Sequence, residues 1–185
     1  LRENLLKYSV HTAEEAHKTG IPMMRPLPMV FPEDKEAVYW EDEYFYGSDL
    51  LVAPVHQEGE KRRIYFPSGS WINLLDFRKM VGGNRIFQVD VPIDKIPVYI
   101  REGACILSVM NGELQLGQSM TYEKKNTVLM SRALNETSGK RYADGKEIEY
   151  NILGQTGEDF FILRHASETE FIVLLGFDRK PESLE

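Results

Sequence analysis

Residues 44–55 have the sequence YFYGSDLLVAPV, and this stretch decides the fold class. Apolar residues follow a period of two from Tyr44 onward, and Leu50 to Val55 then form a continuous apolar run. A run of this length is typical of a β-strand that is buried on both faces. The stretch therefore predicts that this part of the chain lies inside a β-sheet.

More short strands are predicted on the C-terminal side of this stretch, because apolar runs alternate with clusters of turn residues. The first runs cover residues 63–67, 71–75, 86–91, 96–100 and 104–107. After a polar segment at residues 110–118, further runs cover residues 127–134, 148–152, 160–164 and 170–175, with a turn predicted at Ser138-Gly139. Short strands with regular turn signals favour an antiparallel β-sandwich, so the predicted class is mainly β.

An amphipathic helix is predicted at residues 1–19. Its apolar residues recur at steps of three and four: Leu5, Leu6, Val10, Ala13 and Ala16. Gly20 fits the left-handed position that ends a helix, and Pro22 prevents its continuation. The three prolines between Pro26 and Pro32 exclude a central strand there, which leaves Met23-Met24 as a short strand. A helix with one apolar face needs a surface to pack on, and little else in the sequence is helical.

The composition excludes several kinds of partner. The 185 residues are 42% hydrophobic and 28% charged, which is typical of an ordinary folded protein. The formal net charge of −7 argues against a nucleic-acid partner, because phosphate binding needs a basic surface. No apolar run approaches the roughly 20 residues of a membrane-spanning helix, so no membrane partner is expected. Uncharged ligands such as sugars remain compatible with the composition.

Few residues suggest catalysis or metal binding. The close histidine pair His11 and His17 lies about 240° apart around the predicted helix, so the two side chains do not share a face. We therefore expect no zinc site, no other metal and no cofactor. Cys105 is the only cysteine and lies in an apolar run, which favours a buried and inert thiol.

The densest group of carboxylates is Glu41-Asp42-Glu43. Glycoside hydrolysis uses two carboxylates, but abundant acids usually face solvent and adjacent strand residues alternate sides, so we expect no catalytic residue here. Arg25 is more unusual, because Met24 and Pro26 flank it in a segment where an unpaired charge would be costly. A buried arginine prefers a carboxylate partner, and we predict a structural ion pair between Arg25 and Asp42.

Seven strings follow one another in a fixed order along residues 5–103. They are LLKYS (5–9), EAHKTGIP (15–22), MRPL (24–27), FPED (31–34), EYFYGSDLLVAPV (43–55), YFPSGSW (65–71) and IPVYIREG (96–103). In this order and spacing they resemble the C-terminal part of the family thirty-one glycoside hydrolases. The first four resemble the end of that family's catalytic barrel, and the other three resemble the passage into its first C-terminal β-domain. The resemblance covers about residues 5–107.

The resemblance implies an arrangement of domains. Residues 1–43 would form the last helix and strand of a (β/α)8 barrel, with the connection that leaves it. Residues 44–112 would form a proximal antiparallel β-sandwich, and residues 113–185 a complete or incomplete distal β-rich domain.

The resemblance also implies a function for the parent protein, which would be a retaining α-glycosidase that acts on α-glucosides or related α-glycosides. In such enzymes one aspartate attacks the anomeric carbon and another serves as acid and base. Both aspartates and the main sugar-binding residues precede the matched part of the family. We therefore expect no catalytic residue here, assign no substrate-binding residue, and expect the isolated chain to be inactive.

The implied partners are the remainder of the chain's own barrel and an α-glucoside-type carbohydrate. An exposed apolar face on the predicted helix would also favour a homo-oligomer of the isolated chain. Because the chain begins at Leu1 inside a helical segment, we expect a fragment whose localisation signal, if it has one, would lie upstream.

A non-catalytic carbohydrate-binding or structural β-sandwich module is the alternative. Aromatic residues bear on this choice: Trp40, Tyr44, Phe45, Tyr46 and Trp71. We expect core and interdomain packing from them, and sugar stacking is the other role open to them. Residues 1–31 favour the glycosidase fragment, because an autonomous sandwich needs neither the helix nor the proline-rich segment.

Overall fold

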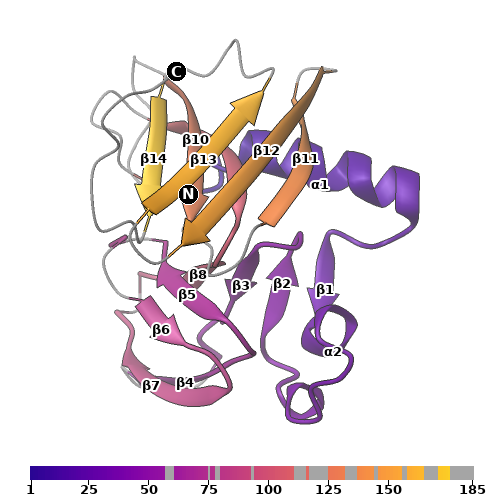
Figure 1. The fold of residues 1–185 in the computed structure, drawn as a ribbon. Helices are drawn as coiled ribbons and strands as arrows, with labels where there is room; N and C mark the ends of the chain where they lie inside the picture. The colour runs from indigo at the N-terminus through magenta and orange to yellow at the C-terminus, as the bar shows by residue number, and fades with distance from the viewer. Residues whose placement is uncertain are drawn as a thin grey trace.

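A computed structural model shows the fold of the chain (Figure 1). The structure describes residues 1–56, 61–74, 76–77, 80–92, 94–110, 116, 125–131, 137–143, 146–155, 158–164 and 171–175. The helices are α1 (Leu6–Thr19), α2 (Leu27–Val30) and the 3-10 helix η1 (Ala37–Tyr39). Strands dominate the rest, so the prediction of a mainly β fold is confirmed.

The largest sheet contains six strands in the order β1-β2-β3-β8-β5-β6, and all of its pairs are antiparallel. Its strands are β1 (Met24–Pro26), β2 (Tyr44–Tyr46), β3 (Leu50–Val52), β5 (Ser70–Asn73), β6 (Met80–Gly82) and β8 (Val98–Arg101). The stretch that decides the fold class supplies β2 and β3, which form a hairpin near the middle of this sheet.

The central strands of this sheet are buried on both faces, as the apolar run predicts. Leu50 and Val52 belong to one hydrophobic core, together with Leu5 and Leu129. Leu51, between them, belongs to a second core on the opposite face, which also holds the aromatic side chains Phe45, Phe66, Trp71 and Tyr99. Because strand residues alternate sides, the sheet forms a layer between the two cores.

The remaining strands form three smaller sheets. One has the order β14-β10-β9, one has the order β11-β12-β13, and β4 pairs with β7. Their bounds are β4 (Lys61–Phe66), β7 (Arg85–Asp90), β9 (Cys105–Met110), β10 (Lys125–Ser131), β11 (Thr137–Ala143), β12 (Lys146–Gln155), β13 (Glu158–Arg164) and β14 (Phe171–Leu175). All these pairs are antiparallel except β10 with β14, which is parallel. The predicted turn at Ser138-Gly139 is wrong, because both residues lie inside β11 and pair with β12.

Helix α1 lies beside β9 and β11, and it ends at Gly20 as predicted, with a left-handed backbone (φ 76°). Part of the predicted apolar face is exposed in this chain, as expected, since Leu6 and Val10 are 61% and 45% exposed. Leu5, directly before the helix, lies in the first core, and Tyr8 and Thr12 are fully buried. The buried side of the helix is therefore not the side that carries Leu6 and Val10.

Candidate functional site

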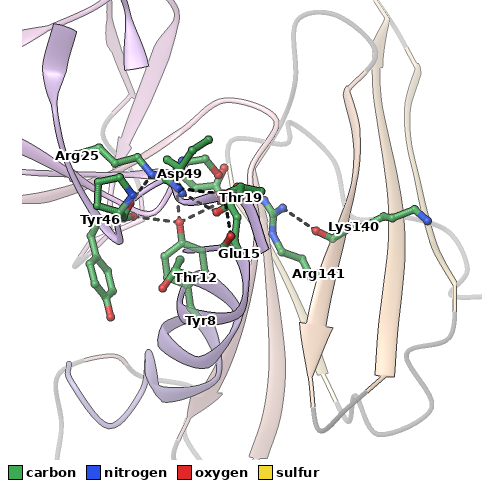
Figure 2. Close-up of polar contacts among 12 residues, drawn as sticks. Tyr8, Thr12, Glu15, Thr19, Arg25, Tyr46, Asp49, Lys140 and Arg141 are labelled. Carbon is green, nitrogen blue, oxygen red and sulfur yellow. Dashed lines mark hydrogen bonds and ion pairs between the residues drawn. The ribbon is translucent and has the colours of Figure 1, made fainter. Parts of the chain in front are cut away.

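A buried polar cluster joins α1, the β2–β3 turn and β11 (Figure 2). The Arg141 guanidinium forms an ion pair with the Asp49 carboxylate, with 2.7 Å between Nη2 and Oδ2. Each side chain is only 8% exposed. A buried pair of this kind must satisfy its remaining donors and acceptors, because desolvation is costly.

The Tyr8 hydroxyl of α1 provides some of the hydrogen bonds that Asp49 needs. It lies 3.0 Å from the Tyr46 carbonyl oxygen and 3.2 Å from Asp49 Oδ2, and it accepts a hydrogen bond from the Asp49 backbone N–H at 3.2 Å. Burial, followed by the neighbouring Asp49 carboxylate, raises the pKa of Tyr8 well above its usual value. The hydroxyl therefore stays protonated and holds the turn against the helix.

Gly47 makes this close approach possible. Its backbone is left-handed (φ 65°), and an added Cβ would lie 2.2 Å from the Tyr8 hydroxyl oxygen. Only glycine both tolerates this backbone and leaves room for the tyrosine.

The other donors of Arg141 bond to backbone carbonyls. Nε donates to Cys105 at 2.7 Å, and Nη1 donates to Lys140 at 3.0 Å. The guanidinium also lies over the Tyr150 ring, 4.8 Å from its centroid. A hollow of about 330 Å³ borders this cluster, but the guanidinium covers the Tyr150 ring, which is only 7% exposed. The hollow therefore offers no free aromatic face.

The thiol of Cys105 is fully buried beside the Arg141 contact, as the sequence predicts. Burial raises the pKa of Cys105 to about 12. The thiolate, which is the reactive form, is therefore scarce at neutral pH.

The acidic triplet is divided between surface and core. Asp42 Oδ2 lies 3.0 Å from Arg62 Nη2 and 3.2 Å from His56 Nε2. Glu43 is buried, and its Oε1 accepts a hydrogen bond from the Tyr65 backbone N–H at 3.0 Å. Burial raises the pKa of Glu43 to about 8, although Arg62 lies 3.6 Å from the same oxygen. The two carboxyl groups therefore lock β4 to the segment that precedes β2.

The predicted ion pair between Arg25 and Asp42 is wrong, since the structure gives each of them another partner. Arg25 is buried as expected, but its Nη2 lies 2.6 Å from Glu15 Oε2 on α1, and its Nε donates to the Pro22 carbonyl at 2.8 Å. Asp42 instead pairs with Arg62. The strand pattern could have revealed this, because Arg62 alternates with exposed residues and shares the buried side of β4 with Ile64.

An aromatic groove lies outside the buried cluster, around η1. It has a volume of about 490 Å³, and Tyr39 and Trp40 line it. Tyr39 is 78% exposed, whereas Trp40 stacks on Tyr65 with 5.7 Å between ring centroids and 15° between planes. The other predicted aromatics serve packing: Phe45 and Trp71 are buried, and Tyr44 and Tyr46 are half-buried against a core.

Metal binding and membrane crossing find no support in the described residues. These residues contain no group of three or more His, Cys, Asp or Glu side chains that could hold a metal ion. Among the helices of the described part of the chain, none has the length and apolar character needed to cross a membrane.

The two-core β-structure resembles parts of known proteins. Residues 20–106 match the family model described as "Glycosyl hydrolase family 31 C-terminal domain". The chain thus fits the C-terminal part of a glycosyl hydrolase family 31 enzyme.

Curated relatives agree with this assignment. The chain is 35% identical over 117 residues to an isomaltosyltransferase from Sporosarcina globispora, which covers 63% of this chain and 11% of that protein. It is 32% identical over 107 residues to alpha-glucosidase 2 from Bacillus thermoamyloliquefaciens. That match covers 57% of this chain and 14% of that protein. The chain thus spans only a small part of the length of these relatives.

Solved structures share the fold. The cycloalternan-forming enzyme from Listeria monocytogenes, in complex with a pentasaccharide substrate, superposes with a TM-score of 0.77 and 28% sequence identity. The match covers 83% of this chain and 15% of that one. A dextranase from Flavobacterium johnsoniae matches with a TM-score of 0.69 and 29% sequence identity. That match covers 83% of this chain and 20% of the dextranase chain.

Proposed function

We propose that this chain is the C-terminal part of a retaining α-glycosidase, whose whole protein acts on α-glucosides or closely related α-glycosides. Support comes from the relatives, which include alpha-glucosidases, an alpha-xylosidase and an isomaltosyltransferase. The names of the glucosidases and of the xylosidase specify α-glycosides as substrates. Cleavage would use two aspartates of the preceding barrel, one as nucleophile and one as acid and base.

The role proposed for this chain is to complete and support that barrel. Residues 1–43 would close the barrel, residues 44–112 would form the proximal β-domain, and residues 113–185 would belong to the distal one. No side chain of this chain is assigned a catalytic role, and the isolated chain is expected to be inactive.

One observation carries the proposal, namely the apolar surface on the N-terminal elements. Leu6 and Val10 of α1 are 61% and 45% exposed, Met24 of β1 is 57% exposed, and Met29 of α2 is 51% exposed. Large apolar side chains exposed on successive elements are typical of a surface that another part of the protein covers. The preceding barrel segments are the proposed cover.

The coding sequence upstream of the Leu1 codon provides the first test. We expect a continuous open frame with alternating strand and helix patterns. The upstream polypeptide and the 185-residue chain would then be expressed separately and together, and the hydrolysis of p-nitrophenyl α-glucoside would be measured. Activity is expected only when both are present. Hydrolysis by the 185-residue chain alone, or an upstream frame without a barrel pattern, would overturn the proposal.

A matched pair of variants tests the proposed contact surface. Val10→Asp places a charge on the exposed apolar side of α1 and should weaken recovery of activity on mixing. Thr19→Asp places the same charge at an exposed position about 180° around the helix from Val10 and should leave recovery unchanged. Equal behaviour of the two variants would contradict the assignment of this surface.

A further inference from the structure

The groove beside η1 combines an exposed aromatic ring with a fixed one. Tyr39 is 78% exposed, which is unusual for a large aromatic side chain. Trp40 lies next to it, and both line a groove of about 490 Å³ together with Glu36, Glu41 and Arg63. We propose that this groove binds a neutral oligosaccharide, with the exposed Tyr39 ring as the stacking surface and Trp40 bordering the bound sugar.

Neighbouring side chains hold the Trp40 indole in place. Its Nε1 donates to Glu36 Oε1 at 3.2 Å, and its ring stacks on Tyr65. The Arg63 guanidinium lies 5.7 Å from the indole centroid. Arg63 and Tyr65 project from the same face of β4, so both contact the indole from the side of that strand. A ring fixed in this way loses little conformational freedom when a ligand binds.

The charges of the groove disfavour an anion and are compatible with a neutral ligand. Glu36, Glu41 and Asp42 outnumber Arg63 among the charged side chains that line it, which disfavours an anion. A cationic ligand would meet Arg63, whose guanidinium already lies over the Trp40 ring. A sugar carries no charge, its hydroxyls can donate to carboxylates and accept from a guanidinium, and its C–H face can pack on an aromatic ring.

The hollow beside Arg141 does not offer the same chemistry. Its one aromatic side chain, Tyr150, is 7% exposed and is covered by the Arg141 guanidinium. Among the aromatic residues that the structure describes, Tyr39 and Trp40 are the pair that line a groove with one ring open to solvent.

The choice of α-linked glucose as the sugar rests on the proposed function. The test is an NMR titration of the 185-residue chain with maltotriose and, separately, with isomaltotriose. The chain has two tryptophans, so the two indole N–H signals report on two places at once. The signal of Trp40 should shift and saturate, whereas that of Trp71, which is 1% exposed, should stay in place.

Tyr39→Ala should weaken the binding about tenfold, which is the loss of one aromatic stacking contact. Val38→Ala is the matched control, because Val38 lies in the same turn, is 57% exposed and does not line the groove. It should bind as tightly as the unmodified chain. A thermal melt of each variant should show that folding is unchanged.

Two results would overturn the sugar site. One is a Trp40 indole N–H signal whose shift does not reach saturation with either sugar, and the other is equal sugar affinity of Tyr39→Ala and the unmodified chain. Neither result would affect the barrel proposal, because recovery of hydrolysis after mixing tests that proposal separately.

Discussion

Arg141 and Asp49 form a buried ion pair across 92 residues of the chain, with 2.7 Å between Nη2 and Oδ2. Arg141 belongs to β11, whereas Asp49 belongs to the turn between β2 and β3. The pair is completed by Tyr8 of α1, so a single cluster connects three regions that are far apart in sequence.

Asp49→Ala should lower the free energy of unfolding by about 3–5 kcal/mol, because it leaves the Arg141 charge buried without its partner. Urea denaturation of both chains measures the difference. Glu147→Ala is the control, since it removes one partner of Lys140 in an ion pair of similar length (2.6 Å) at the surface. The control should cost clearly less, because solvent screens an exposed pair. Equal losses would show that burial does not set the strength of the pair.

Gly47→Ala and Gly20→Ala separate backbone strain from crowding. Both glycines have a left-handed backbone, with φ of 65° and 76°. An added Cβ meets nothing within 4 Å at Gly20, but lies 2.2 Å from the Tyr8 hydroxyl oxygen at Gly47. Gly20→Ala should cost about 1–2 kcal/mol, the usual penalty of this conformation, and Gly47→Ala clearly more. Thermal melts measure the difference. Equal melting temperatures of the two variants would contradict the larger cost expected at Gly47.

Glu43 should make stability depend on pH. Burial raises its pKa to about 8, so the folded chain binds this proton more tightly than the unfolded chain does. The contribution of Glu43 to stability is therefore full below the unfolded pKa, near 4.5, and it is lost as the pH rises towards 8.

Glu43→Gln should keep an acceptor for the Tyr65 N–H while removing this titration. Its stability advantage over the unmodified chain should grow between pH 5 and pH 8 by more than about 1 kcal/mol. Chemical denaturation at a series of pH values measures the advantage. Glu41→Gln, at the exposed end of the same triplet, should show no such growth. An advantage of Glu43→Gln that is constant with pH would contradict the raised pKa.

Cys105 should resist thiol reagents in the folded chain. Its side chain is fully buried and burial raises its pKa to about 12, so both access and thiolate are lacking. Ellman's reagent at pH 8 should react far more slowly with the native chain than with the chain unfolded in urea. Rapid reaction of the native chain would show that β9 opens readily.

The sequence predicts the strand hairpin best, because its information is local. The alternation of Leu50, Leu51 and Val52 between two cores follows directly from an uninterrupted apolar run. The strand β11 is missed because Ser138-Gly139 resembles a turn and its basic residues carry no apolar period. Its place is set by pairing with β12 and by the contact of Arg141 with a residue far away in sequence.

The prediction for Arg25 is wrong, and the buried side of α1 is not predicted, for a related reason. Counting apolar residues identifies a helix but does not show which face is covered, and Tyr8 and Thr12 are buried through contacts with later strands and turns. For Arg25 the need for a carboxylate is correctly inferred, but several acids could meet it. Folding selects Glu15, which the helix places closest. The composition of a segment thus indicates what it requires, and the tertiary structure decides which residue provides it.

The buried pair of Arg141 and Asp49 also constrains how this protein can change over evolutionary time. Loss of one charge leaves the other buried without a partner. Joint replacement by two apolar side chains of similar volume instead removes both desolvation costs. Positions 49 and 141 should therefore covary among homologues and pass through a deleterious intermediate whenever only one of them mutates. A double variant, Asp49→Leu with Arg141→Met, should recover much of the stability that either single substitution loses.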